Sequence, residues 1–586
     1  MTRSTSITFF RPLFFRRNRM AFTSPDPSTC VLDAFRNSIA QRVAAALPPL
    51  TVDQVYSGVD YGKKGVDFTI ALPRFKLGKP EEVAAKVIAQ FQPDELIESA
   101  TPDKAFLHFQ CKTPTLIRDI LTQVHSLTHL TPVPCYGSNS TGKGKKVIIE
   151  YSSPNIAKSF HVGHLRSTII GGFLANLYKA CGWDVVSMNY LGDWGTQFGL
   201  IATGFEKYGS QEELEKDAIK HLFDVYVKVN KDADADPEVK AEAARWFKRM
   251  EDGDESALKN WRVWRALSVK KYTEEYERLN IAFDLYTGES MVGREWQDKA
   301  LARLEEMGLI EDVDGAKIVN LEQYKMGKAV LRKRDGTSIY LTRDIGGAIE
   351  RYEKYKFDKM IYVVSSQQDL HLSQFFKVLE LMEFPWASDL QHVNYGLVQG
   401  MSTRKGNVVF LDQIIREAAQ VMHEQMQKNE EKYKAVIDPE SVSMEIGITG
   451  VKIQDMAAKR INNYTFNWER MKSFEGDTGP YLQYAHVRLS SISRKNPHLI
   501  PLPPPEQIDT TSLAASSHAR EIVFLLGTYP DVVKVALKTQ EPSGVVTFAG
   551  RRTIDKARAK LWMYECARDV LGAAMRLLSI RPLDRM

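Results

Sequence analysis

Residues 145–183, KKVIIEYSSPNIAKSFHVGHLRSTIIGGFLANLYKACGW, predict a β-strand, a short polar loop at 152–155 and then a helix. The helix opens near the tetrapeptide HVGH at 161–164, and histidines three residues apart lie on one helical face. The glycine between them lets a flat ring such as adenine approach the backbone. The free N–H groups of a first helical turn favour phosphate. The stretch therefore predicts a site that activates a nucleotide.

Alternative interpretations of the HVGH tetrapeptide are a chance match and a metal site. Four-residue patterns occur by chance in many proteins, so the tetrapeptide alone is a weak signal. The zinc-protease pattern needs histidines four residues apart with a glutamate between them, and that pattern is absent here. The five cysteines form no Cys-x-x-Cys pair: Cys30, Cys111, Cys135, Cys181 and Cys566. We therefore expect no zinc and no metal-ligating residue.

Length and composition indicate a multidomain globular protein. At roughly 150 residues per domain, 586 residues are enough for several cores. A hydrophobic content of 44% and a charged content of 26% are ordinary for a soluble protein. The formal net charge is only +5, so any binding of nucleic acid has to depend on local basic surface.

The first 22 residues, MTRSTSITFFRPLFFRRNRMAF, differ from the rest of the chain. They contain five arginines, and no acidic residue precedes Asp26. This composition is typical of a mitochondrial presequence, and a disordered basic tail is the alternative. A second start at Met20 would omit the signal, so we expect the mitochondrial matrix, the cytoplasm or both. The apolar pieces are too short to span a bilayer, and we expect no membrane contact.

The pattern of elements predicts three folded domains. Residues 23–135 mix helical spacing with strand-like alternation, which indicates an α+β domain. Strand-like runs alternate with helical segments over 143–411, which predicts an α/β fold with a doubly wound parallel sheet of the Rossmann type. A stretch at about 202–310, rich in Glu, Lys, Ala and Leu, predicts a helical insertion in that domain. Residues 412–586 predict an all-α bundle.

Four long motifs occur in order along the chain: SSPNIAKSFHVGHLRS (152–167), NYLGDWGTQFG (189–199), MSTRKGN (401–407) and DTGPYLQYAHVRL (477–489). Together they resemble the class I aminoacyl-tRNA synthetases, and more narrowly the arginyl-tRNA synthetases of fungal and eukaryotic type. The resemblance extends from about residue 50 to the C-terminus.

The resemblance implies an arginine–tRNA ligase that acts in protein synthesis. Such an enzyme activates L-arginine with ATP to arginyl-adenylate and transfers it to the 3′ end of tRNA(Arg). It implies that residues 23–135 are an additional tRNA-binding domain and that 412–586 bind the anticodon. It also implies a monomer that uses ATP as a substrate, with Mg²⁺, and has no bound organic cofactor. The alternatives are a class I synthetase for another amino acid and a tRNA-binding relative that no longer catalyses.

The resemblance assigns catalysis to His161, His164 and Lys158. Most class I enzymes carry a key lysine in a later loop, but this chain has Thr403 at that position. Arginyl-tRNA synthetases commonly place a substitute lysine before the histidine motif, where Lys158 lies. The residues assigned to ATP are His161, Gly163, His164, Met401, Ser402, Arg404 and Lys405.

Recognition of arginine has a physical requirement that two acids can meet. A guanidinium is planar, always charged and has five donors, so its pocket needs carboxylates and further acceptors. Glu150 and Asp344 match the two acids of the family, and ordinary surface charge is the alternative for either one. Tyr340 lies four residues before Asp344, on the same face of a helix. The residues assigned to arginine are Glu150, Ser153, Pro154, Asn155, His164, Tyr340, Asp344 and Gln368.

Two tyrosines in the last motif are the candidates for contact with RNA. Tyr481 and Tyr484 are three residues apart and share a helical face. Stacking of a base on a tyrosine contributes roughly 1–3 kcal/mol. Aromatic side chains at this spacing more often belong to a core, so the assignment to tRNA depends mainly on the resemblance.

Overall fold

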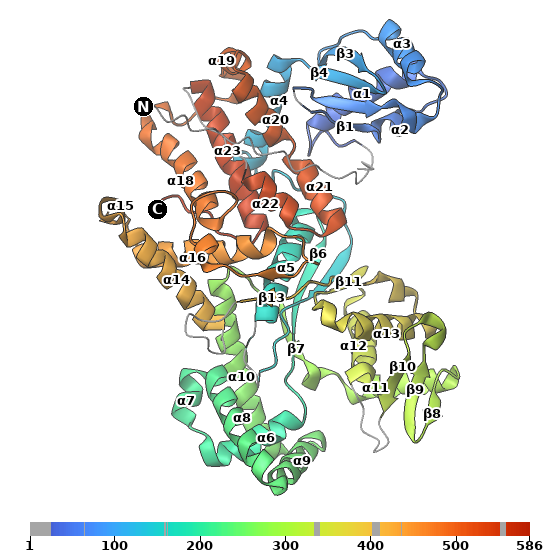
Figure 1. The fold of residues 1–586 in the computed structure, drawn as a ribbon, viewed down its shortest axis with the longest axis vertical. Helices are drawn as coiled ribbons and strands as arrows, with labels where there is room; N and C mark the ends of the chain where they lie inside the picture. The colour runs from blue at the N-terminus through green and yellow to red at the C-terminus, as the bar shows by residue number, and fades with distance from the viewer. Residues whose placement is uncertain are drawn as a thin grey trace, which may run out of the picture. The chain divides into compact units, whose positions relative to one another are not determined.

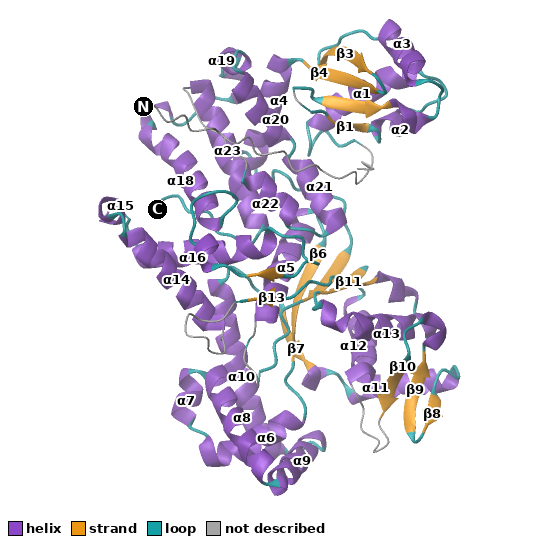
Figure 2. Cartoon of the chain, in the orientation of Figure 1, coloured by secondary structure: helices purple, strands orange, loops and turns teal. Residues whose placement is uncertain are grey.

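The computed structural model describes residues 25–63, 65–156, 160, 162–332, 340–400, 411–434, 436–550 and 558–586 (Figures 1 and 2). The chain forms two compact units. The first contains the residues up to Gln123 together with Pro503–Thr528, and the second contains Val124–Leu502 and Tyr529–Met586. The presequence expected at 1–22, with Met20, lies outside the described residues.

The first unit is built on a four-stranded antiparallel sheet with the order β1-β2-β4-β3. Helices pack with this sheet, which agrees with the α+β arrangement that the alternating patterns predict (Figure 2). Its elements are α1 (Leu32–Ala46), α2 (Val52–Tyr56), β1 (Val59–Tyr61), β2 (Phe68–Ala71), α3 (Pro80–Gln90), β3 (Ile97–Asp103), β4 (Phe106–Cys111), the first part of α4 (Thr113–His129), α19 (Thr511–Ala514) and α20 (Ser517–Gly527).

Helix α20 packs within the first unit. The Arg520 guanidinium donates to both carboxylate oxygens of buried Asp67, at 2.9 and 2.6 Å. The Phe524 ring meets the rings of Tyr61 and Phe68 edge-on, at 5.8 and 5.9 Å between centroids. By its contacts, 503–528 belongs to the first compact unit, whereas the domain expected over 412–586 stays a prediction. Helical spacing predicts a helix here but does not identify its partner.

The second unit contains a five-stranded sheet in the order β12-β11-β5-β6-β7, and all of its pairs are parallel. The chain proceeds from β5 through β6 to β7 on one side and then continues with β11 and β12 on the other. This confirms the doubly wound prediction, and ligands bind where such a strand order reverses. The elements are β5 (Lys146–Glu150), α5 (Val162–Ala180), β6 (Asp184–Leu191), β7 (Leu285–Gly288), β11 (Lys359–Tyr362) and β12 (Leu390–His392).

The segment between β6 and β11 is only partly helical. Most of the insertion expected at about 202–310 is helical, and the short strand β7 interrupts it before α11; the small antiparallel sheet begins after it, at Glu311. A four-residue strand gives too little alternation to stand out beside long helices. The elements are α6 (Thr196–Tyr208), α7 (Gln211–Lys216), α8 (Ala218–Ala235), α9 (Pro237–Glu251), α10 (Glu255–Arg278), α11 (Arg294–Glu306), β8 (Glu311–Val313), β9 (Ala316–Asn320), β10 (Lys328–Arg332) and α12 (Tyr340–Tyr355). Helix α13 (Asp369–Leu381) follows β11 and precedes β12.

The remaining chain of the second unit is mainly helical, as predicted. Helix α16 is buried around most of its circumference and packs against α14 and α18, which makes it the central helix of this part. A short parallel pair, β13 with β14, interrupts the helices. The elements are β13 (Val398–Gln399), α14 (Leu411–Gln427), α15 (Glu430–Lys434), α16 (Pro439–Met456), β14 (Tyr464–Thr465), α17 (Trp468–Met471), α18 (Gly479–Lys495), α21 (Tyr529–Thr539), α22 (Ser543–Ala549) and α23 (Arg558–Leu577).

Candidate active site

The candidate site begins where the chain leaves β5 and turns through Ser152 and Ser153. Both residues have positive φ angles, 70° and 48°, in the left-handed region that residues with side chains rarely adopt. Such conformations cost on the order of 1–3 kcal/mol each and persist only when the surroundings enforce them. The loop is therefore held in place by its neighbours.

Ser152 has three hydrogen bonds that fix this turn. Its N–H donates to Ser167 Oγ at 2.9 Å, and Thr168 Oγ1 donates to Ser152 Oγ at 2.8 Å. The hydroxyls of Ser152 and Tyr276 are hydrogen-bonded at 2.6 Å, and both residues are buried. Sequence reasoning missed Tyr276, because it lies on α10, 124 residues from Ser152, and no local pattern marks it.

The second sequence motif packs directly against this loop. The Ser153 N–H donates to Asn189 Oδ1 at 3.2 Å, and the Gly192 N–H donates to the Pro154 carbonyl at 3.1 Å. A side chain at Gly192 would place its Cβ only 3.1 Å from Asn155 Nδ2. Glycine therefore permits the close approach that positions Ser153, Pro154 and Asn155 at the sheet edge.

The histidine motif opens α5 as predicted. The Tyr395 hydroxyl donates to the Gly163 carbonyl at 3.0 Å, and the His164 ring lies 5.4 Å from the Phe160 ring. These contacts place Gly163 and His164 in the first turn of the helix. The other residues assigned to catalysis or ATP lie outside the described residues: Lys158, His161, Met401, Ser402, Arg404 and Lys405.

Glu150 ends β5 beside a guanidinium that belongs to this chain. Its Oε2 lies 2.6 Å from Arg351 Nη1, and the residue is only 7% exposed. The Arg351 guanidinium also lies over the Tyr190 ring, 4.8 Å from its centroid. Burial raises the pKa of Glu150, the Arg351 charge opposes that rise, and the Asp344 charge adds to it. Sequence reasoning did not identify Arg351 as the partner of Glu150.

Asp344 is the more accessible of the two predicted acids. Its side chain is 28% exposed, and its Oδ2 lies 2.7 Å from Nε2 of His371 on α13. This hydrogen bond raises the pKa of His371, and burial opposes the rise. Asp344 lies on the same face of α12 as Arg351, seven residues later, and Arg351 reaches Glu150 at the end of β5. Arg351 thus connects the elements that carry the two predicted acids.

Tyr340 and Gln368 lie on the exposed side of this site. Tyr340 is the first residue of α12 and is 66% exposed. Gln368 is exposed at the end of a short 3-10 turn before α13, three residues before His371. Residues three apart share a helical face, so Gln368 lies on the side of α13 from which His371 reaches Asp344.

The acid of the GDWG motif anchors the helical insertion to the sheet. Asp193 is fully buried and accepts from Arg265 Nε at 2.6 Å. Its carboxylate also accepts from the Ser290 N–H at 2.9 Å, and its carbonyl accepts from Trp261 Nε1 at 2.8 Å. Asp193 thereby ties α10 and the segment after β7 to the end of β6, so its role is structural.

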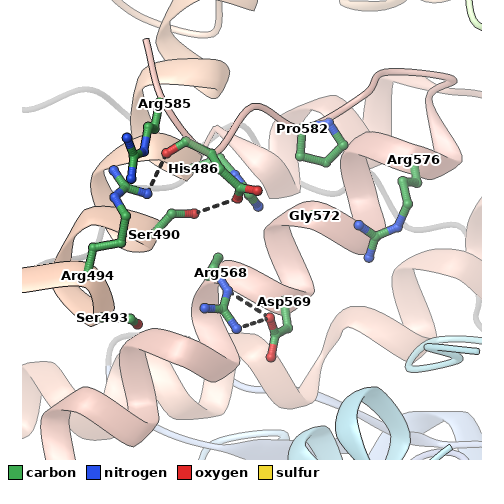
Figure 3. A pocket seen from close by; sticks show the side chains of 11 residues that line it. His486, Ser490, Ser493, Arg494, Arg568, Asp569, Gly572, Arg576, Pro582 and Arg585 are labelled. Atoms are coloured by element: carbon green, nitrogen blue, oxygen red, sulfur yellow. Dashed lines mark hydrogen bonds and ion pairs between the residues drawn. The ribbon is translucent and has the colours of Figure 1, made fainter. Parts of the chain in front are cut away.

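A cavity of about 630 Å³ lies among the C-terminal helices (Figure 3), and none of its lining residues is one of those assigned to arginine. Four arginines give it an excess of positive charge over its two aspartates, although the Arg568 guanidinium donates to Asp569 at 2.8 Å. The lining residues are His486, Ser490, Ser493, Arg494, Arg568, Asp569, Gly572, Arg576, Pro582, Asp584 and Arg585.

The two candidate tyrosines lie on α18, on the other side of this helix from the cavity. Tyr484 is 37% exposed and accepts a hydrogen bond from Arg488 Nη1 at 2.8 Å, while Tyr481 is half-buried. At 3.6 residues per turn, Tyr484 points roughly opposite to His486 and Ser493, which line the cavity. Helix α18 thus turns Tyr484 and the cavity-lining residues to different sides.

Comparison with known families identifies two parts of the chain. Residues 132–468 match the family described as tRNA synthetases class I (R), catalytic domain. Residues 482–551 match the DALR anticodon binding domain.

Similar proteins cover nearly the whole chain. The cytoplasmic arginine–tRNA ligase of Saccharomyces cerevisiae is 47% identical, over 96% of each chain. The mitochondrial arginine–tRNA ligase of the same organism is 44% identical, over 89% of this chain and 84% of the relative. The crystal structure of arginyl-tRNA synthetase from Plasmodium falciparum has the same fold, with a TM-score of 0.75 at 20% identity, over 95% of this chain and 99% of that one. The chain belongs to the class I aminoacyl-tRNA synthetases, in the family of the arginine–tRNA ligases.

Proposed function

We propose that this chain is an arginine–tRNA ligase, which activates L-arginine with ATP and transfers the arginyl group to the 3′ end of tRNA(Arg). The observation that carries the proposal is the partly exposed carboxylate of Asp344, on the helix whose Arg351 reaches Glu150 at the end of β5. Because Arg351 already pairs with Glu150, Asp344 is the carboxylate that remains for a guanidinium substrate. High identity to named arginine–tRNA ligases supports the same conclusion.

For arginine, we assign different tasks to the two sides of the site. The exposed carboxylate of Asp344 pairs with the substrate guanidinium, and the Tyr340 hydroxyl adds an acceptor. Glu150 contributes negative charge from the end of β5, although one of its oxygens already pairs with Arg351. The remaining residues assigned to the α-amino and carboxylate end, and to the rim beside it, are Ser153, Pro154, Asn155, His164 and Gln368.

Activation joins the arginine carboxylate to the α-phosphorus of ATP and releases pyrophosphate. The protein has to hold two anions in line and to stabilise the charge that develops on phosphorus. The first turn of α5, with Gly163 and His164, offers backbone N–H groups to the phosphates. Mg²⁺ accompanies ATP as part of the substrate. The sequence motifs alone support the roles of Lys158 and His161 in catalysis, and of Met401, Ser402, Arg404 and Lys405 in binding ATP.

For tRNA, we propose that Tyr481 and Tyr484 stack on bases and that the arginines of the neighbouring cavity attract backbone phosphates. The match to an anticodon binding domain over 482–551, which includes Tyr484 and Arg494, supports the proposal for these two residues. We further propose that the protein is a monomer and that it acts in mitochondria, the cytoplasm or both. Relatives with both cytoplasmic and mitochondrial names support the two locations. Among the described residues, no helix combines the length and apolar character needed to cross a bilayer.

Charging of total tRNA with each of the twenty amino acids tests the proposal. We expect acid-precipitable product with arginine alone. Charging with a different amino acid would show that the two acids serve another substrate. Binding of tRNA without any charging would instead identify a relative that has lost catalysis.

A further inference from the structure

The last turn of α10 contacts both the 152–155 loop and the C-terminal helices of the same unit. The Tyr276 hydroxyl bonds Ser152 at 2.6 Å. The Tyr276 carbonyl accepts from the N–H groups of Leu279 and Ile281, at 2.9 and 3.0 Å, which closes the helix. Any shift of this helix end therefore moves the hydroxyl that holds Ser152.

Lys452 fixes the same helix end from α16. It is 1% exposed, and its Nζ donates to the carbonyl of Leu279, three residues after Tyr276. The same Nζ donates to the Ser579 carbonyl at 2.7 Å, just beyond the end of α23. One buried lysine thus joins the ends of two helices that are far apart in the sequence.

Glu445 makes a parallel connection seven residues earlier on α16. Its carboxylate accepts from Asn280 Nδ2 at 3.1 Å and from the Arg581 N–H at 3.2 Å. Residues seven apart lie on one helical face, so α16 presents Glu445 and Lys452 together to the chain that follows α10 and α23. The position of Tyr276 is therefore set by helices of the C-terminal part.

We propose that Tyr276 is a positioning residue for arginine binding, which holds the 152–155 loop through Ser152, and that Lys452 and Glu445 set its place from the C-terminal helices. The inference rests on the proposed function, because its readout is the affinity for arginine. Under this proposal, the helical insertion helps to position the arginine site, although none of the four sequence motifs lies on α10. Tyr276 does not touch the reacting atoms.

Substitution of Tyr276 by phenylalanine tests the first link, because it removes the hydroxyl and keeps the ring. The matched control is Tyr272→Phe on the same helix. Tyr272 is also fully buried and stacks on Tyr276 at 5.8 Å, but its hydroxyl has no hydrogen-bond partner among the described residues. We expect Tyr276→Phe to raise KM for arginine by about ten-fold, with kcat and KM for ATP within about two-fold. Tyr272→Phe should leave all three within about two-fold.

Equal kinetic behaviour of these two folded variants would overturn the proposal. Wild-type protein that charges no tRNA with arginine would instead overturn the proposed function. A double-mutant cycle gives a second check, because Ser152→Ala and Tyr276→Phe remove the same bond. The double variant should match Ser152→Ala alone, and effects that multiply would contradict a shared bond.

Lys452→Met tests the second link, with exposed Lys459→Met as the control beyond the end of α16. We expect Lys452→Met to raise KM for arginine by about three-fold in the wild-type background and to add nothing in the Tyr276→Phe background. If Lys452→Met does not fold, Glu445→Gln is used in its place for the same measurement. An equal rise in both backgrounds, or no rise in a folded variant, would contradict an action through Tyr276.

Discussion

The two sides of the proposed arginine site differ in how many of their polar contacts are already made within the chain. On the β5 side, Glu150 is 7% exposed and paired with Arg351, and Ser152 is 3% exposed with its hydrogen bonds made. On the α12–α13 side, Asp344 is 28% exposed and its carboxylate meets His371. The β5 side is preorganised. On the α12–α13 side, Asp344 can exchange its contact with His371 for a contact with the substrate. Two acids of the same site therefore have different physical tasks.

Removal of the Glu150 charge tests the preorganised side and has the largest expected effect. Glu150→Gln would leave the Arg351 guanidinium, whose side chain is only 12% exposed, without its counter-charge, which costs about 3–5 kcal/mol. We expect urea denaturation to show a loss of that size in the free energy of unfolding. Replacement of both partners, Glu150→Gln with Arg351→Met, should restore part of the loss. If Glu150→Gln is as stable as the wild type, the ion pair between Glu150 and Arg351 does not stabilise the fold.

Removal of the Asp344 charge tests the open side. Asp344→Asn removes a charge-assisted contact with the substrate guanidinium, so KM for arginine should rise by roughly 100-fold. The free energy of unfolding should change by less than about 1 kcal/mol, because the carboxylate is partly exposed. Steady-state kinetics and denaturation measure the two quantities. Exposed Glu353→Gln on α12 serves as the control. If Asp344→Asn binds arginine normally but is unstable, Asp344 has a structural role and the assignment of the open side to the substrate is wrong.

The pH dependence of arginine binding tests whether His371 competes for Asp344. The pKa of His371 is raised by its bond to Asp344, so the stabilising pair is complete below about 6.5 and is lost as the pH rises through the raised value. A protonated ring competes with the substrate guanidinium. KM for arginine should therefore fall by about two- to five-fold from the acidic to the alkaline side of that window. His371→Gln should flatten this dependence, and a fall that persists in the variant would exclude His371 as its cause.

Tyr340 should have the smallest effect of the four. Its side chain is 66% exposed, so a hydrogen bond from substrate to its hydroxyl replaces one to water. We expect Tyr340→Phe to raise KM for arginine by less than about two-fold and to leave stability unchanged. A rise as large as that of Asp344→Asn would show that substrate binding buries this side of the site more completely than the open geometry indicates.

The sequence predicts the parts of this site that depend on local pattern. Alternation and apolar runs identify β5, β6 and β11. The parallel order then places Glu150 at the carboxyl end of β5, beside the point where the strand order reverses. Arg351 and Tyr276 could not be predicted in this way. Their partners lie far away along the chain, and a buried arginine or tyrosine has no periodic signature before the fold is known.

The path of the chain through the first unit has a consequence for its synthesis. Asp67 lies in the early part of that unit, and its partner Arg520 follows 453 residues later. At roughly 5–20 residues per second, a ribosome needs on the order of 20–90 s to make the intervening chain. During that time the nascent unit exposes the surface around Asp67 and Phe68 that α20 later covers. A nascent chain that ends before α20 therefore leaves the first unit unfinished, although its sheet has been synthesised in full.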